Sequence, residues 1–167
     1  MSRYGEAITG VVLEAQFAAK LKGEYQFRLH PELWATPEIN AYYLGRTWTS
    51  VRFVDPSPHD IPNESGIYMF VVAPHCAALA DHSYIFYVGK ASNLKTRYRE
   101  YLLEKACACE NPRERVVRFL NHLEDHVFFH FTLVPQNELD RAESLLKDNL
   151  TPFGNTQVSI IGRLNTA

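Results

Sequence analysis

Four short apolar runs stand out in the hydrophobic pattern of this chain. Residues 66–73, 84–89 and 127–135 are rich in β-branched and aromatic side chains, as buried strands are. The first two runs are consecutive and are predicted to pair as a hairpin. Residues 157–161 are predicted to form a last, short strand.

Three segments between these runs are predicted to be helices. The first begins after Asn93, whose side chain can cap a helix. The second is predicted over residues 112–124, because proline is favoured in a first turn. The third spans residues 137–150 and is predicted to be stopped by Pro152 and Gly154.

The order of these elements, β-β-α-α-β-α, predicts an α+β fold. We expect a small mixed, mainly antiparallel three-stranded sheet with helices on its faces. The segment 55–66 is dense in proline, aspartate, asparagine, serine and glycine, which is typical of a linker or long loop. The predicted division is therefore an N-terminal extension or subdomain over residues 1–61 and a second domain over residues 62–167.

Length and charge narrow the function classes. The chain has 167 residues, of which 46% are hydrophobic, enough for one folded domain with an appendage. Its formal net charge of −2 does not indicate a nonspecific coat for polyanions. Between Lys90 and Arg118, however, eight Lys and Arg stand against four Asp and Glu. This local basic region fits contact with DNA at one place, although an ordinary solvated helix pair would show the same pattern.

The cysteines and the apolar runs bear on the compartment. Three cysteines, Cys76, Cys107 and Cys109, give an odd count and no disulfide framework, which favours a reducing cytosol. No apolar run reaches the roughly 18 residues of a membrane helix, and Glu6 and Glu14 interrupt the start of the chain as a signal peptide would not allow. We therefore expect a cytoplasmic protein that does not contact a membrane.

The helix after Asn93 carries the first candidate for anion chemistry. Arg97 borders its apolar stripe and lies one turn before Tyr101, so the two side chains share a face. The planar fork of arginine suits phosphate. Gly89 lets the backbone come close to a bulky anion, and Lys90 adds a second positive charge at the end of a predicted strand.

The helix over residues 137–150 carries the candidate cation ligand. Glu143 lies at the margin of its apolar stripe, where a carboxylate can reach the edge of the core. One carboxylate, together with waters and substrate phosphate, is the usual way in which proteins hold magnesium. Without further information, Arg97 and Glu143 are as consistent with a structural ion pair between two helices.

Two tripeptides, GIY at 66–68 and YVG at 87–89, resemble the two signatures of the GIY-YIG nuclease family. Lys90, the run NLKTR ending in Arg97, and then Tyr101 follow in the family's order. Each tripeptide alone is a weak signal, but the ordered set on the predicted elements is a specific one.

The closing segment of the family is also matched. Glu143 is followed nine residues on by Pro152 and twelve residues on by Asn155, so the resemblance covers residues 62–156. The motifs are most similar to the N-terminal incision domain of the bacterial excision-repair nuclease, and small GIY-YIG restriction endonucleases are an equally good comparison. This chain differs from the repair protein in a long connection between the signature strands and an added helix around residues 112–124.

The resemblance implies a GIY-YIG nuclease domain over residues 62–167 that hydrolyses DNA with one divalent cation, Mg²⁺ or Mn²⁺, on Glu143. It implies DNA contacts from Gly89, Lys90, Lys95 and Arg97. The implied catalytic residues are Tyr68, Tyr87, Lys90, Arg97, Tyr101, Glu143 and Asn155.

Roles within this set are also implied by the family. Tyr68 would take the proton from water with Tyr87 in support, and a cation beside the phenol, Lys90, would lower its pKa. Arg97 would neutralise charge on the phosphate, and Tyr101 would orient water or phosphate by a hydrogen bond. Asn155 is expected to fix the end of the Glu143 helix and the wall of the site, and not to react.

Several alternatives stay open at this point. The chain could be a catalytically silent nucleic-acid or protein binding module, or a nuclease directed at RNA. Restriction, phage defence, repair and mobile-element roles all fit, and the extension over residues 1–61 could contact the target, a second copy or a partner protein. Two further clusters could be ordinary core or surface residues or could have a function. One could bind zinc: Cys107, Cys109, His122 and His126. The other could stack on bases: Trp34, Tyr42, Tyr43 and Trp48.

Overall fold

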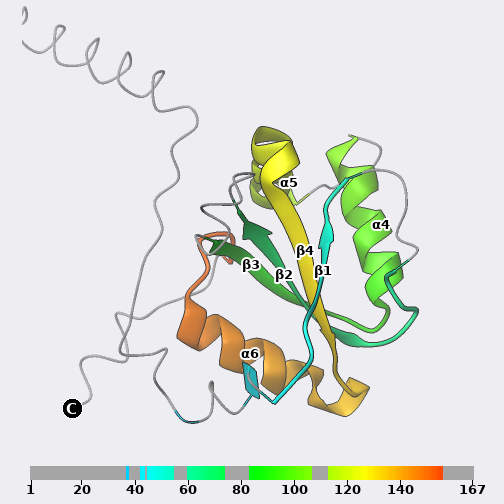
Figure 1. Cartoon of the computed structure of the whole chain (residues 1–167), viewed down its shortest axis with the longest axis vertical. Coiled ribbons are helices and arrows are strands. Elements are labelled where there is room, and N and C mark those ends of the chain that lie inside the picture. The colour runs from blue at the N-terminus through cyan, green and yellow to red at the C-terminus, as the bar shows by residue number, and fades with distance from the viewer. Residues whose placement is uncertain are drawn as a thin grey trace, which may run out of the picture.

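The computed structural model describes residues 37, 42–43, 45–54, 60–73, 83–106 and 113–155. The view in Figure 1 shows these residues as a twisted sheet with helices packed on it. The elements, in chain order, are β1 (Thr49–Arg52), β2 (Gly66–Val72), β3 (Tyr84–Ala91), α4 (Leu94–Lys105), α5 (Glu114–Leu123), η2 (Glu124–His126), β4 (Val127–Leu133), η3 (Gln136–Glu138) and α6 (Leu139–Leu150).

The sheet confirms the predicted α+β class and corrects its strand count. Its four strands lie in the order β1-β4-β2-β3, and every pairing is antiparallel. The additional strand, β1, pairs with β4 from Thr49 opposite Phe131 to Arg52 opposite Phe128. The strand is short and mostly exposed, so it lacks the apolar run that marks the other three. The division at residue 61 stays a prediction, but the sheet draws one strand from the N-terminal side of it.

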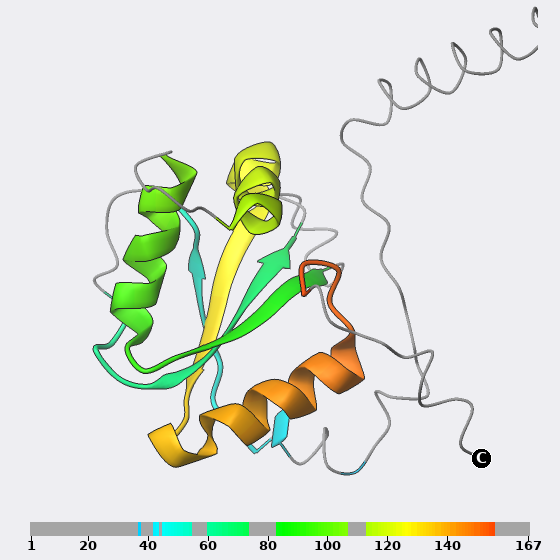
Figure 2. The ribbon, with the colours of Figure 1, turned by 180° about the vertical axis from the view of Figure 1, so that it is seen from behind.

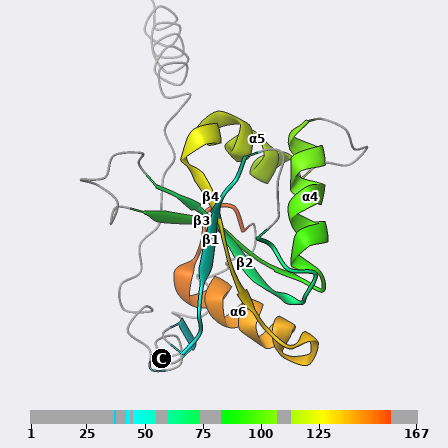
Figure 3. The ribbon, with the colours of Figure 1, turned by 45° about the vertical axis from the view of Figure 1, so that its right-hand side comes forward.

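The two faces of the sheet pack against different helices. Figure 3 shows α4 and α5 on one side of the strands and α6 on the other, and Figure 2 shows the same arrangement from behind. Alternate residues of β2 supply the two cores, so Tyr68 and Phe70 pack with α4 and α5, whereas Ile67 and Met69 pack with α6. A strand buried on both faces explains why β2 reads as a continuous apolar run.

The helix boundaries follow local signals. Asn93 caps α4 as predicted, because its side-chain oxygen accepts a hydrogen bond of 2.9 Å from the amide of Thr96. The end of α6 differs from the prediction. Thr151, and not Gly154, takes the left-handed conformation that closes the helix, with φ of 44°, and Pro152 then prevents continuation.

Aromatic residues before β1 pack against the α6 side of the sheet. Tyr42 and Trp48 contact the apolar core there, and the rings of Tyr43 and Trp48 stack with centroids 5.1 Å apart. These residues therefore contribute to packing, in line with the alternative that they are core residues. His130 on β4 forms a hydrogen bond with Ser50, with a distance of 3.0 Å between the histidine Nε2 and the serine Oγ.

Other expectations lie outside the described residues. These include Trp34, the three cysteines with the zinc hypothesis that depends on two of them, and the last strand predicted over 157–161. Among the described helices, none is both long and apolar enough to cross a membrane.

Candidate active site

A bulge in β3 decides which side chains reach the candidate site. Phe70 of β2 pairs with Tyr87, and Val71 pairs with Ile85, so Phe86 is the extra residue. Strict alternation would place Phe86 and Tyr87 on opposite faces. Because of the bulge both pack against the core under α4 and α5, and Tyr87 lies beside Tyr68. The two signature tyrosines are thereby brought together, as the family resemblance predicts.

Three phenols form the centre of this arrangement. Tyr68 and Tyr101 are almost fully buried, and their hydroxyl oxygens are 3.0 Å apart. The ring of Tyr87 lies 6.2 Å from that of Tyr68 and 6.4 Å from that of Tyr101, between centroids. Tyr87 is only half-buried and therefore leads from the buried pair towards solvent.

Gly89 is the residue that makes room for the phenol of Tyr68. It pairs with Tyr68 across the β2–β3 ladder. A Cβ at this position would lie 2.5 Å from both the Cζ and the hydroxyl oxygen of Tyr68, and 2.9 Å from the ring of Tyr87. The signature glycine thus serves the packing of the two tyrosines in this chain, in addition to the close anion approach predicted for it.

Burial sets the acid–base properties of the phenol pair. Desolvation is the main cause that raises the pKa of Tyr68 well above its usual value of 10.0, and the neighbouring Tyr101 and Tyr87 add to this increase. The charge of Arg97 acts to lower the pKa of Tyr68, but the effect of burial is larger. Burial likewise raises the pKa of Tyr101. The expectation that Lys90 lowers the pKa of Tyr68 is therefore wrong, because the Lys90 side chain lies on the other face of the sheet.

Arg97 lies where the helix periodicity places it, one turn before Tyr101. Its Nη1 donates a hydrogen bond of 2.6 Å to Oε2 of Glu100. The possible structural ion pair between Arg97 and Glu143 is not formed, since these two residues have other charged partners. Arg97 Nε is buried and has no acceptor among the described residues.

On the α6 side of β3, charged residues gather around one carboxylate. Glu143 Oε2 lies 3.0 Å from the ammonium of Lys90, and Oε1 lies 2.8 Å from that of Lys147. Lys90 also pairs with Asp140, one turn before Glu143. The side chain of Glu143 is 14% exposed, whereas that of Asp140 is 89% exposed. We call these four residues the lysine–carboxylate cluster, and we call Tyr68, Tyr87, Tyr101 and Arg97 the tyrosine cluster.

The donor set around Glu143 fits a hard divalent cation. Two carboxylates one helical turn apart already share one cationic group, the ammonium of Lys90. Magnesium is commonly held by one or two carboxylates, with waters and substrate phosphate as the remaining ligands. Glu143 would be the protein ligand, because it is the more buried and better fixed of the two.

Asn155 fixes the edge strand of the sheet and does not reach the phenols. Its Oδ1 accepts a hydrogen bond of 2.8 Å from the amide of Val88, and its Nδ2 donates one of 2.7 Å to the carbonyl of Val88. Beside it, the amide of Gly154 donates to the carbonyl of Phe86, the bulged residue, at 2.7 Å. The segment after α6 therefore covers the outer edge of β3 next to the bulge. The side chain of Asn155 therefore holds β3 and not the end of the Glu143 helix, and its proposed absence from the chemistry stays a prediction.

Lys90 is the link between the two clusters. It follows Gly89 directly in β3, so one residue faces the tyrosine cluster and the next reaches the lysine–carboxylate cluster.

Lys95 lies in the first turn of α4 and stays a predicted DNA contact. Four charged residues of the two networks were not predicted from the sequence, although the spacing of three or four from a named residue marks most of them: Glu100, Asp140, Lys147 and Arg113.

A comparison with protein-family models gives no match, and a comparison with curated proteins gives none either. Similar solved structures are those of the GIY-YIG N-terminal endonuclease domain of UvrC from Thermotoga maritima. A point mutant bound to the catalytic divalent cation is 22% identical, with a TM-score of 0.39, covering 58% of this chain and 88% of that domain. The domain bound to magnesium is 24% identical, with a TM-score of 0.38, covering 57% of this chain and 88% of that domain.

These structures are of a GIY-YIG domain. The motifs in residues 62–156 of this chain resemble those of the GIY-YIG family. Each is a similarity of this chain to a different protein.

Proposed function

We propose that this chain is a divalent-metal-dependent endonuclease that hydrolyses phosphodiester bonds of DNA. The observation that carries the proposal is the assembly of the signature residues around β3. The bulge brings Tyr87 beside Tyr68, α4 brings Tyr101 and Arg97 to the same place, and α6 brings Glu143 to Lys90, the next residue after Gly89. A module that only binds nucleic acid has no need for the carboxylate.

Tyr68 is the proposed base that takes a proton from the attacking water. Its raised pKa makes the phenolate a strong base but a rare one at neutral pH. Tyr101, 3.0 Å away between hydroxyl oxygens, holds the phenol of Tyr68 in one orientation. Tyr87 is half-buried and is the phenol best placed to position water or phosphate at the surface.

Charge relief on the phosphate is assigned to the cationic groups of this chain. Arg97 lies one turn before Tyr101 on α4, and the hydroxyl of Tyr101 is 3.0 Å from that of Tyr68, so a phosphate held by Arg97 would lie beside the base. A cation bound to Glu143 would supply Lewis-acid stabilisation of the phosphate and of the leaving oxygen. Lys90 and Lys147 orient the Glu143 carboxylate through one ion pair to each of its oxygens.

The test is cleavage of supercoiled plasmid DNA by the purified chain. We expect conversion to nicked or linear DNA with magnesium and none with a chelator. A double variant, Tyr68→Phe with Glu143→Ala, purified in the same way, must be inactive, which excludes a contaminating nuclease. Binding of DNA without magnesium-dependent cleavage would instead identify a silent binding module. Preferential cleavage of RNA would replace DNA as the substrate.

A further inference from the structure

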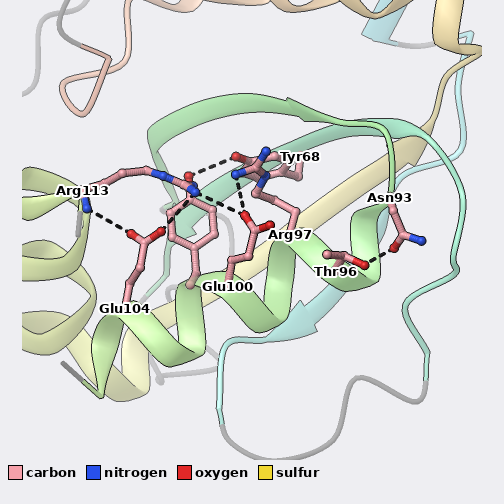
Figure 4. A network of polar contacts seen from close by, with 8 residues as sticks. Tyr68, Asn93, Thr96, Arg97, Glu100, Glu104 and Arg113 are labelled. Atoms are coloured by element: carbon pink, nitrogen blue, oxygen red, sulfur yellow. Dashed lines mark hydrogen bonds and ion pairs between the residues drawn. The ribbon is translucent and has the colours of Figure 1, made fainter. Parts of the chain in front are cut away.

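Arg113 brings a second guanidinium to the tyrosine cluster from outside the family motif. It directly precedes α5 (Glu114–Leu123). Its guanidinium carbon lies 4.4 Å from the centroid of the Tyr101 ring, on the ring face. Figure 4 shows Arg97 on α4 and Arg113 at the start of α5 approaching Glu100 from two directions.

Glu100 is the anion between the two arginines. Its Oε2 accepts from Arg97 Nη1 at 2.6 Å and from Arg113 Nη2 at 3.3 Å. One carboxylate oxygen within reach of two guanidinium groups is the arrangement expected of a phosphate oxygen in a two-arginine site. The side chain of Glu100 is 42% exposed, so it can leave this position towards solvent without disturbing the core.

A second carboxylate fixes Arg113 independently of Glu100. Glu104 is buried, and its Oε1 lies 3.0 Å from Arg113 Nη2, while its Oε2 accepts a hydrogen bond of 3.1 Å from the Arg113 amide. Departure of Glu100 would therefore leave Arg113 in place, held by Glu104 and by the Tyr101 ring. The buried Nε of Arg97 is a further donor that has no acceptor among the described residues.

We propose that Arg113 and Arg97 together bind one backbone phosphate of the DNA, and that Glu100 occupies the position of this phosphate while DNA is absent. The proposal rests on the proposed nuclease function and deepens it. A phosphate bound there lies against Tyr101, and through it beside Tyr68. Arg113 is thus a substrate-binding residue that directly precedes α5, and Glu100 is a competitor of the substrate for the same two arginines.

The test measures DNA affinity as a function of salt, by fluorescence anisotropy with a short duplex and calcium in place of magnesium to prevent cleavage. Removal of one phosphate contact lowers the salt slope by about 0.9 and weakens binding about tenfold near 0.1 M salt. We expect this result for Arg113→Gln. Arg99→Gln, which removes an equal charge from the exposed side of α4, is the matched control and should keep the wild-type slope.

Two further variants keep the proposal testable if Arg113→Gln is destabilised by the unpaired Glu104. The double variant Glu104→Gln with Arg113→Gln removes both charges of the buried pair, and should show the same loss of slope while circular dichroism reports a folded protein. Glu100→Gln contacts neither the phenols nor Glu104, and should tighten DNA binding several-fold.

The outcomes separate this proposal from the function on which it rests. An unchanged salt slope in the folded arginine variants, or unchanged affinity in Glu100→Gln, would overturn the two-arginine site while plasmid cleavage by the wild type upheld the nuclease. Failure of the wild type both to bind and to cut DNA would overturn both.

Discussion

The two clusters at β3 differ in how their polar groups are held. The tyrosine cluster lies under α4, where the hydroxyls of Tyr68 and Tyr101 are enclosed by an aromatic core. The lysine–carboxylate cluster lies at the margin of α6, where the side chain of Asp140 is 89% exposed and that of Lys90 is 39% exposed. Burial raises the pKa of Tyr68 and of Tyr101, whereas the charged residues at α6 are held by ion pairs with one another.

This contrast teaches how one strand can serve two kinds of chemistry. Side chains of β3 alternate between the faces beyond the bulge, so Gly89 packs against the buried phenol of Tyr68, whereas Lys90, the next residue, reaches the carboxylate of Glu143. Each half can therefore be altered with little change in the other, which makes the comparison testable.

The largest effect on cleavage is expected from a change in the lysine–carboxylate cluster. Glu143→Ala should lower magnesium-dependent cleavage about a thousandfold, because metal-ion stabilisation of a phosphoryl transition state is worth several kcal/mol. Plasmid cleavage over a range of magnesium concentrations measures this. Glu138→Gln, which removes an exposed charge just before α6, is the control and should remain active. Normal turnover of Glu143→Ala in magnesium would show that this carboxylate is not the ligand.

In the tyrosine cluster, Tyr68→Phe should lower the cleavage rate about a hundredfold or more, because it removes the base. It should leave DNA affinity unchanged. The wild-type rate should rise with pH between 7 and 9, because the phenol of Tyr68 is protonated throughout that range and the phenolate fraction grows with pH. Rate measurements across this range in both proteins check the prediction.

A matched control for this variant is Tyr84→Phe, which removes a phenol that is 45% exposed at the start of β3. A pH-independent wild-type rate, or normal cutting by Tyr68→Phe, would contradict the assignment. If the two clusters act on one phosphate, the double variant with Glu143→Ala should be little worse than the poorer single variant, because residues that act as a unit are not additive.

A smaller effect is expected where packing and not chemistry is altered. Gly89→Ala should lower the free energy of unfolding by about 1–3 kcal/mol, since the new methyl group overlaps the ring of Tyr68. Urea unfolding followed by circular dichroism measures the loss. Ser92→Ala, an exposed change just after β3, should stay near the wild type. Equal stability of Gly89→Ala and the wild type would show that Tyr68 can move aside.

The smallest effect concerns alkaline stability. Tyr68 holds its proton more tightly in the folded than in the unfolded chain, so its contribution to stability is complete below pH 10 and is lost as the pH rises from there towards the folded-state pKa. The free energy of unfolding of the wild type should therefore fall more steeply above pH 10 than that of Tyr68→Phe. Urea titrations at pH 9, 10 and 11 compare the two, and parallel curves would contradict the buried, raised pKa.

Local signals in the sequence were sufficient for part of the fold. The strand character of β2, β3 and β4 and the cap at Asn93 depend on side chains within a few residues of each other, and the structure has them. The neighbourhood of Tyr68, Tyr87 and Tyr101 also followed from the ordered motif. In contrast, β1 was missed, because a short and exposed strand shows its character only when β4 pairs with it.

The sequence by itself determined which residue types stand at which spacing, and hence the chemistry that this chain can carry. Only the tertiary structure decided the bulge at Phe86, the face on which Lys90 lies, and the meeting of Arg113 with Tyr101. Each of these depends on a contact with another element: β2 for the bulge, α6 for Lys90, and α4 for Arg113. The physical reason is that strand alternation is a local property, whereas register, burial and ion pairing are settled by residues far away in the chain.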